Sequence, residues 1–317
     1  MTAPLKKFEH GLTTVLKTTN TSQMKKIFFL MLFLIPIVSF GQNLDELLEE
    51  ESKMGKNYES AAFKASRVIN GHSVSQMKAN HLDFRISHRF GEMNGGIYEL
   101  YGLDQANIHL SLEYGLKNWL MLGAGRSNVQ KTYDGFAKIQ LFRQTAGSNG
   151  SPVFVTYVGS TEIFSTEWPN PERDNKFTSR MTFVHQLVIA RKFNKNLSLQ
   201  LSPSLIHKNL TPTKNDPNDL LALGISSRHK VSKRVAITAE YYYAFRAENV
   251  TVNYPNSLSA GVDIETGGHV FQIMVTNSQA MREGGFIWGE NNGNWSDGGI
   301  HLGFNVSRVF SFDKYEY

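Results

Sequence analysis

Charged side chains recur at alternate positions of several segments, and alternation along a β-strand places such positions on one face. If the apolar positions face outwards, the charged positions share an inward face on which both signs are present. In a sheet that closes into a barrel, these inward residues would line the lumen. The candidates are Asp83, Arg85, Arg89, His109, Glu113, Lys138, Glu162, Arg180, Glu240, Asp263, Glu265 and His301. A buried ion needs a partner or water. Two hypotheses therefore stay open: the charges line a narrow pore, or they pair into a structural plug.

Metal binding is one chemistry that these residues could supply, since imidazole and carboxylate groups suit zinc or iron. The candidates are His109, Glu113 and His301. His109 and Glu113 stand four residues apart, which on a strand is about 13 Å, so they cannot share an ion directly. Asp216 and Asp219 offer oxygen ligands for calcium, but the carboxylates are too few and no bidentate glutamate follows. We expect polar filling and an ordinary turn, with no metal and no cofactor.

Ester hydrolysis is a second chemistry to consider, because some twelve-stranded outer-membrane barrels are phospholipases with a serine and a histidine on the outer face. Such an enzyme needs its serine and histidine within hydrogen-bond reach. His185 can face outwards, but its nearest polar neighbours on that face are Ser179 and Arg191. The sequence shows no catalytic constellation, and we do not expect an enzyme. A lipid hydrolase ranks behind the non-enzymatic functions.

The elements that must position these residues are strands. Period-two alternation predicts an all-β chain, with twelve strands at residues 78–90, 106–116, 119–127, 133–145, 152–164, 177–193, 197–207, 219–230, 234–247, 258–265, 269–277 and 298–312. Strands of about ten residues suit a tilted membrane crossing. We therefore expect residues 77–317 to form a single transmembrane antiparallel β-barrel of about 12 strands. Pro203, in mid-strand, removes a ladder hydrogen bond and predicts a bulge or kink.

The connections between the predicted strands alternate in length, which is typical of outer-membrane barrels. The short ones are residues 117–118, 146–151, 194–196, 231–233 and 266–268. The long ones are residues 91–105, the stretch after residue 127, and residues 165–176, 208–218, 248–257 and 278–297. An even number of strands places both termini at the short-turn end, which in such barrels is periplasmic.

Residues 24–41 have the parts of a secretory signal peptide. Two lysines follow Met24, residues 27–38 are apolar, and Ser39 and Gly41 are small residues before a cut at Gln42. The apolar run is shorter than the roughly 20 residues of a membrane span, and Pro36 interrupts it, which disfavours the alternative of an uncleaved anchor. Residues 1–23 match no targeting signal and resemble a misannotated upstream extension. We expect export to the cell outer membrane through a cleaved signal peptide.

Residues 42–76 precede the barrel and are expected to form a periplasmic N-terminal segment with a short helix. Leu44, Leu47 and Leu48 make an apolar stripe of about two helical turns, and residues 55–76 have no clear period. One hypothesis is a partly ordered periplasmic segment, which so short a stripe favours. The other is a helix that docks on the barrel mouth or enters the lumen.

Charge and composition exclude several classes of protein. The pI is 9.2, but residues 1–41 hold five lysines against one glutamate, so +4 of the net charge of +5 lies in the part expected to be removed. No basic block remains to bind nucleic acid. The sequence has no cysteine, which excludes disulfides, thiolate metal sites and a cysteine nucleophile.

Eight stretches resemble DUF5777, a β-barrel family of unknown function from Bacteroidetes. They are RVINGHS at 67–73, ISHRFG at 86–91, YGLDQA at 101–106, KTYDG at 131–135, LVIARKF at 187–193, EYYY at 240–243, GVDIETGGHVFQ at 261–272 and FNVSRVF at 304–310. The resemblance runs from about residue 42 to the end of the chain. It implies a barrel fold and an outer-membrane location, and it brings no activity and no catalytic residues.

The function expected from these patterns is a narrow pore for a small-molecule solute, or recognition through the long loops. The alternative is a structural or interaction barrel with a closed lumen. Outer-membrane lipid would surround either barrel, and the barrel-assembly machinery would insert it.

Overall fold

The computed structural model describes residues 58–313, except 146–149, 169, 212, 214–215, 248–251 and 267–268. The predicted upstream extension at 1–23, the signal peptide at 24–41 and the leucine stripe at 44–48 lie outside the described residues. Within the described ranges, no helix is long and apolar enough to cross a membrane.

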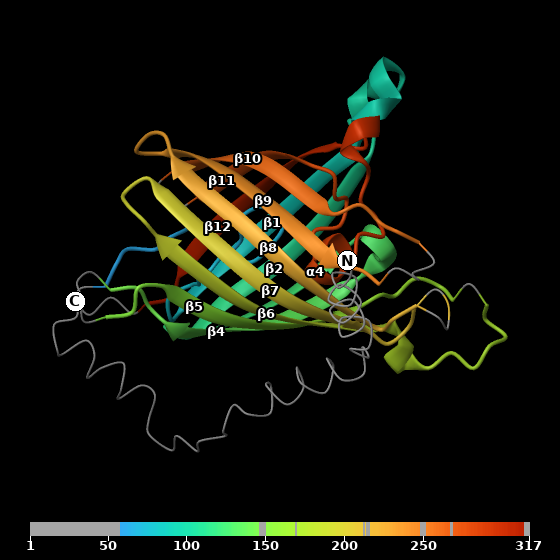
Figure 1. The fold of residues 1–317 in the computed structure, drawn as a ribbon, viewed down its shortest axis with the longest axis horizontal. Coiled ribbons are helices and arrows are strands. Elements are labelled where there is room, and N and C mark those ends of the chain that lie inside the picture. The colour runs from blue at the N-terminus through green and yellow to red at the C-terminus, as the bar shows by residue number, and fades with distance from the viewer. Residues whose placement is uncertain are drawn as a thin grey trace, which may run out of the picture. The chain divides into compact units, whose positions relative to one another are not determined.

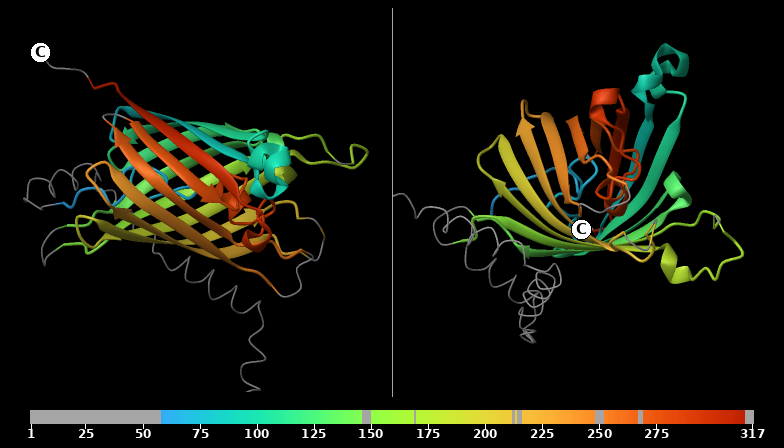
Figure 2. Two further views of the ribbon diagram at one scale, coloured as in Figure 1. Left: turned by 90° about the horizontal axis from the view of Figure 1, so that it is seen from above. Right: turned by 45° about the vertical axis from the view of Figure 1, so that its right-hand side comes forward.

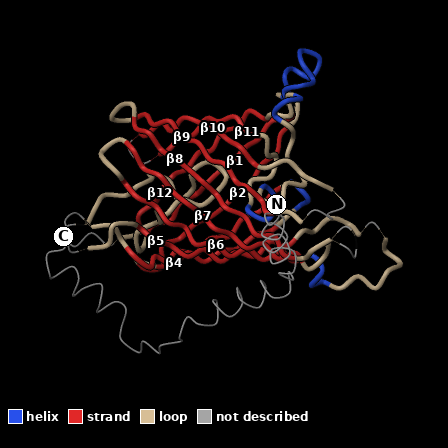
Figure 3. Tube along the Cα trace, viewed as in Figure 1, coloured by secondary structure: helices blue, strands red, loops and turns tan. Residues whose placement is uncertain are grey.

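Twelve antiparallel strands form a closed barrel (Figures 1 and 3). Each strand pairs with its neighbours in sequence, and β1 closes the barrel by pairing with β12. The strands are β1 His81–Glu92, β2 Ala106–Lys117, β3 Leu120–Ser127, β4 Tyr133–Phe142, β5 Phe154–Ile163, β6 Met181–Lys192, β7 Leu197–Lys208, β8 Asp219–Lys230, β9 Val235–Phe245, β10 Ser257–Thr266, β11 His269–Thr276 and β12 His301–Ser311. The predicted fold and all twelve predicted strands are confirmed.

The connections divide the barrel into two ends. At the short-turn end β2 is linked to β3, β6 to β7, β8 to β9 and β10 to β11, and the long-loop end holds the connections that follow β1, β5, β7, β9 and β11. His81 pairs with Ser311, so the first and last strands begin and end at the short-turn end, as predicted. The lengths of two connections, β3–β4 and β4–β5, were predicted wrongly. Residues 128–132 are a tight link through the 3-10 turn η2 (Val129–Lys131), and β4 and β5 are joined by the longer stretch 143–153.

Alternation along β7 shows how sequence sets the two faces of the wall. Leu199 and Leu201 are 40% and 46% exposed on the outside, whereas Gln200 and Ser202 are both 1% exposed on the inside. Pro203 produces no register shift: it pairs with Leu223 of β8 in an unbroken ladder. The predicted bulge is therefore wrong. Proline has no backbone N–H, and the ladder between β7 and β6 is interrupted at this point, between residues 201 and 204. The register of the two strands is the same before and after this gap.

Candidate functional site

The inward side chains of the strands are covered although they line the inside of a barrel. On β2, His109, Ser111 and Glu113 are 1%, 3% and 0% exposed, and Asn305 on β12 is 1% exposed. Two segments of the chain, one reaching in from each end, account for this coverage.

The first is residues 58–80, here called the inner segment, which lies inside the ring of strands (blue in Figure 2). Near its start, Glu59 N donates to Gln144 O at 2.9 Å, and at its end Asn80 N donates to Gly115 O at 2.9 Å. Both contacts lie at the short-turn end. Of residues 62–74 between them, only Lys64 is exposed and the others are buried. The inner segment therefore enters and leaves the barrel at the same end.

This placement corrects the predicted organisation. Residues 62–74 lie in the lumen, as the second hypothesis for this segment holds, and not in the periplasmic position assigned to residues 42–76. They form no helix. The physical reason is that no helical apolar stripe runs through them, whereas polar groups of the wall satisfy their backbone N–H and C=O groups.

Residues 66–73, here called the lumenal hairpin, form the deepest part of the inner segment. Val68 N donates to Gly71 O at 2.9 Å across the turn, and Ser73 N donates to Ser66 O at 2.9 Å across the stem. Gly71 is required by close packing, because a Cβ atom there would lie 2.0 Å from the Tyr242 hydroxyl. The tip therefore fits directly against the wall at β9.

Glu240 of β9 is the main acceptor for the hairpin tip. Its carboxylate accepts hydrogen bonds from the backbone N–H groups of Ile69 at 3.2 Å, Asn70 at 2.8 Å and Gly71 at 3.2 Å. Glu240 is 1% exposed, so these donors replace the water that its carboxyl group would otherwise bind.

Asn70 links the tip to strands of the wall beyond β9. Its Nδ2 atom donates to Ser259 Oγ at 3.1 Å and to Thr276 Oγ1 at 3.3 Å, on β10 and β11. Its Oδ1 atom accepts from Arg89 Nη2 at 2.7 Å, and Arg89 also donates to Asn305 Oδ1 at 3.0 Å. One side chain thus joins the hairpin to strands β1, β10 and β11.

Charges of both signs surround the hairpin stem. The carboxylate of Glu113 lies 3.7 Å from Arg85 Nε and 3.8 Å from Arg67 Nε, and Arg85 Nη2 lies 3.2 Å from Asp83 Oδ2. Ser66 Oγ also donates to Glu113. The structure therefore brings together three of the predicted inward residues, and it adds Arg67 as a partner from the hairpin.

Uncharged and cationic wall groups hold the flanks of the hairpin. Lys138 Nζ donates to the backbone oxygens of Ser66, at 3.1 Å, and Ser75. Gln200 Oε1 accepts from Val74 N at 2.9 Å. These contacts join the inner segment to β4 and β7, so hydrogen bonds attach it to much of the circumference.

The second covering segment is the β11–β12 loop, residues 277–300, which reaches in from the long-loop end with helix α4 (Glu283–Phe286). Phe286 packs edge-on against Tyr242 with ring centroids 5.0 Å apart. Glu162 of β5 accepts from Arg282 Nη1 at 2.5 Å and from Gly284 N at 2.7 Å. The loop thus combines apolar packing with a buried ion pair.

The two covering segments meet at one ion pair inside the barrel. Arg67 Nη1 of the hairpin lies 2.7 Å from Glu283 Oε1 of the loop, and both side chains are almost fully buried. His72 lies 3.7 Å from the same oxygen, but burial, and then the charge of Arg67, hold the pKa of His72 well below its ordinary value. The imidazole is therefore neutral, and Arg67 is the cation that Glu283 requires.

Asp263 and Glu265 of β10 lie together, nearer the short-turn end. Arg228 of β8 pairs with both, at 3.7 Å from Asp263 and with a hydrogen bond to Glu265, and Lys64 lies 3.6 Å from Glu265. Gln272 connects this group to the hairpin, because its Nε2 atom donates to Asp263 Oδ1 at 2.9 Å and to Val68 O at 2.7 Å.

The other predicted residues have separate partners. His109 Nε2 lies 2.8 Å from Asp134 Oδ1, and His301 Nδ1 lies 2.9 Å from Phe90 O. Arg180 was predicted wrongly as an inward strand residue. It belongs to the 3-10 turn η3 (Phe177–Arg180), because β6 begins only at residue 181, and it stacks over Trp168 at 4.0 Å. Among the described residues, no three His, Asp or Glu side chains are placed to hold a metal ion.

The histidine and the acids considered for chemistry on the outer face and in the loops also have ordinary partners. His185 Nδ1 lies 2.6 Å from the Tyr157 hydroxyl. Asp216 accepts from Thr213 N at 3.0 Å within a turn, and Asp219 lies 2.7 Å from His207.

Several residues of the site were missed from the sequence, above all Arg67, Asn70, Arg228, Arg282 and Glu283. Arg67 and Asn70 stand in the stretch RVINGHS that carries the family resemblance, which was the one available signal. Arg282 and Glu283 stand in a loop, where no alternation marks which side chains turn inwards.

The family of membrane-bound β-barrel domains called DUF5777 matches residues 63–310 of this chain. That range contains the lumenal hairpin, nearly all of the strands and the β11–β12 loop. The chain belongs to DUF5777. The DUF5777 match therefore includes the inward-facing hairpin. It assigns the chain to a family of membrane-bound β-barrels.

The other comparisons concern curated proteins and solved structures. Among curated proteins, none matches this chain. Similar solved structures include the KdgM porin (12% identity, TM-score 0.42, 74% of this chain and 99% of that one) and Omp33 of Acinetobacter baumannii (6%, 0.40, 73% and 98%). A third is the CymD monoaromatic hydrocarbon channel (10%, 0.35, 76% and 90%). At such identities and scores, the assignment of this chain rests on the family match and on the closed barrel itself.

Proposed function

We propose that this barrel is an outer-membrane channel for small solutes, and that the lumenal hairpin is its removable plug. The observation that supports this most is the path of the inner segment. Residues 58 and 80 lie at the same end of the barrel, so the hairpin can withdraw without threading its chain through the lumen. Its polar restraints are hydrogen bonds and ion pairs, which water can replace. Val68 and Ile69 also pack in an apolar cluster with Phe154 and Met274 of the wall, so withdrawal must also expose this apolar surface.

The wall that the hairpin covers also suits a water-filled passage. Ser111, Thr156, Gln200, Gln272 and Asn305 face inwards and are all nearly inaccessible. A permanently filled interior gains little net stability from such groups, because each protein–protein hydrogen bond replaces one with water, for a gain of about 1 kcal/mol. A channel that opens needs them, since they bind water when the hairpin leaves. Twelve strands also exceed the eight of barrels that side chains alone can fill.

A closed structural barrel is the second candidate function. The ion pair between Arg67 and Glu283 favours it, because this pair holds the two covering segments together inside the barrel. The two functions differ in one property, which is whether weakening the hairpin contacts produces a passage.

Replacing Glu240 with alanine should raise the permeability of the barrel to small solutes. The change removes the acceptor of three backbone N–H groups, and leaving a buried donor without a partner costs about 1–3 kcal/mol. Planar-bilayer conductance and solute leakage from liposomes would measure the effect. Glu172→Ala, at an exposed acid in the loop between β5 and β6, is the matched control. If the Glu240 variant inserts as an intact barrel and conducts no more than this control, the plugged-channel proposal fails in favour of the structural barrel.

The location proposed for the barrel is the outer membrane of a member of the Bacteroidetes, with insertion by the barrel-assembly machinery. The long-loop end would face outwards and the short-turn end the periplasm, so the hairpin would withdraw into the periplasm. This orientation follows from the unequal loop lengths.

The mature protein should begin at Gln42, because Ser39 and Gly41 satisfy the small-residue rule for signal cleavage. N-terminal sequencing, or mass spectrometry of the membrane-extracted protein, would show the first residue. A protein that retains residues 1–23 in the membrane fraction would contradict both the cleavage and the start at Met24.

A further inference from the structure

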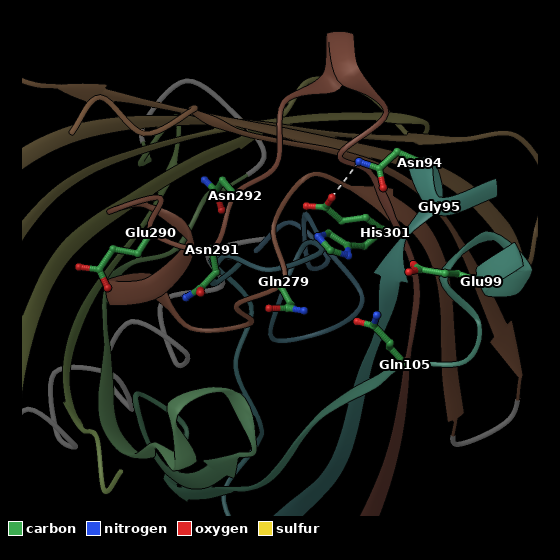
Figure 4. Close-up of a pocket in the computed structure, with 10 residues that line it drawn as sticks. Asn94, Gly95, Glu99, Gln105, Gln279, Glu290, Asn291, Asn292 and His301 are labelled. Carbon is green, nitrogen blue, oxygen red and sulfur yellow. Dashed lines mark hydrogen bonds between the residues drawn. The ribbon is translucent and has the colours of Figure 1, made fainter. Parts of the chain in front are cut away.

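A pocket of about 580 Å³ opens at the long-loop end, between the loop that follows β1 and the β11–β12 loop (Figure 4). Its lining includes three carboxylates, Glu92, Glu99 and Glu290, and no lysine or arginine. Pockets of this volume accommodate small organic molecules. The surplus of negative charge favours a cation as the ligand.

One carboxylate of the pocket is neutralised by a neighbour and two are not. Glu290 Oε1 lies 2.6 Å from Lys208 Nζ, which approaches from outside the lining. Glu92 accepts a hydrogen bond from the neutral amide of Asn94, at 2.9 Å, and no lysine or arginine partner of Glu92 or Glu99 lies among the described residues. The pocket therefore keeps about two negative charges for a ligand.

His301 at the pocket provides an independent sign of a ligand. It is 2% exposed, and its Nδ1 atom donates to Phe90 O at 2.9 Å, which makes Nε2 the acceptor nitrogen of a neutral ring. Nε2 is buried and has no hydrogen-bond partner among the described residues. Asn292 repeats the pattern: its Nδ2 atom donates to Pro255 O and Phe286 O, both at 2.9 Å, which leaves a buried Oδ1 acceptor without a partner.

We infer that this pocket binds a small polyhydroxylated amine of about the size of an amino sugar. An ammonium group supplies the charge that Glu92 and Glu99 lack, and N–H or O–H donors match the unpartnered acceptors. Side-chain amides such as Gln105 and Gln279 also line the pocket, and amides donate to and accept from hydroxyl groups. A bare metal ion fits less well, because among the described residues no three His, Asp or Glu side chains converge to hold one.

This site goes beyond the proposed channel and does not depend on it, because binding is measured on the closed barrel without any transport. The experiment is isothermal titration of the full-length protein in detergent with glucosamine, at a pH at which its amine is protonated. Glucose is the matched ligand, since it has nearly the same size and the same other hydroxyls but carries a neutral hydroxyl in place of the charged amine. Glucosamine should bind at one site and at least about tenfold more tightly, a difference of about 1.4 kcal/mol.

Two variants locate the binding. Glu99→Gln should weaken glucosamine at least about tenfold, and His301→Asn, which can keep the donor to Phe90 O but lacks the second nitrogen, should weaken both sugars. Glu172→Gln, an exposed acid outside the pocket, should change neither. Equal affinity for the two sugars, or glucosamine binding that survives Glu99→Gln unchanged, would overturn the site, whatever the conductance of the barrel.

Discussion

Replacing Arg67 with alanine should release both covering segments of the lumen at once. Arg67 joins the hairpin to the β11–β12 loop through Glu283 at 2.7 Å and lies 3.8 Å from Glu113. Removing one partner of a buried ion pair costs roughly 3–5 kcal/mol, because the other charge stays buried without compensation. Hydrogen–deuterium exchange should then accelerate by roughly two to four powers of ten in residues 66–73 and in the loop, and little in the strands.

The double variant separates the pairing from a general loss of packing. In Arg67→Ala/Glu283→Ala no unpaired carboxylate remains at position 283, so the combined effect should be smaller than the sum of the two single effects. Arg173→Ala, at an exposed position in a loop, is the matched control. Faster exchange in the hairpin alone, with the loop unchanged, would show that the two segments are independent.

Replacing Leu201 with arginine should prevent most of the protein from assembling in the membrane. Leu201 lies mid-way along β7 and is 46% exposed on the outer face of the barrel. An arginine facing lipid near the bilayer midplane costs roughly 2–4 kcal/mol, and near the interface only about 0–1 kcal/mol. The fraction of heat-modifiable folded barrel after reconstitution into lipid vesicles measures the effect.

Val231→Arg is the control for the change of leucine to arginine. Val231 lies in the turn between β8 and β9 and is 55% exposed, so the same charge at this position stays in water. If the two variants assembled equally well, the outer face of the strands would not be in contact with lipid. A soluble barrel would then be the better description.

The strands could be predicted because the two faces of each strand have different surroundings. Leu199, Gln200 and Leu201 alternate because one face meets the outside of the barrel and the other its interior, and that contrast is written at every second residue. The tight link at residues 128–132 could not be anticipated in the same way. Its length depends on where the β3–β4 ladder ends, which pairing between strands decides.

For the contacts inside the lumen, the sequence predicted residues of the barrel wall but not the groups that they bind. The sequence identified Glu113 and Glu240 as inward charges, but not the groups that satisfy them. Glu240 receives three backbone N–H groups, which any residue type could supply. Arg67 and Glu283 are 216 positions apart in loops without periodicity, so their meeting depends on how the closed barrel brings its two ends together.

The most direct test of the plug is to excise the hairpin and measure the conductance of the barrel that remains. Ser66 and Ser73 are hydrogen-bonded across the stem at 2.9 Å, so deleting residues 66–73 joins Ala65 to Val74 with little strain on the rest of the inner segment. In planar bilayers the intact protein should conduct rarely and the deletion variant steadily, with larger sugars excluded before smaller ones. A folded, inserted deletion variant whose conductance is as low as that of the intact protein would contradict the plugged channel.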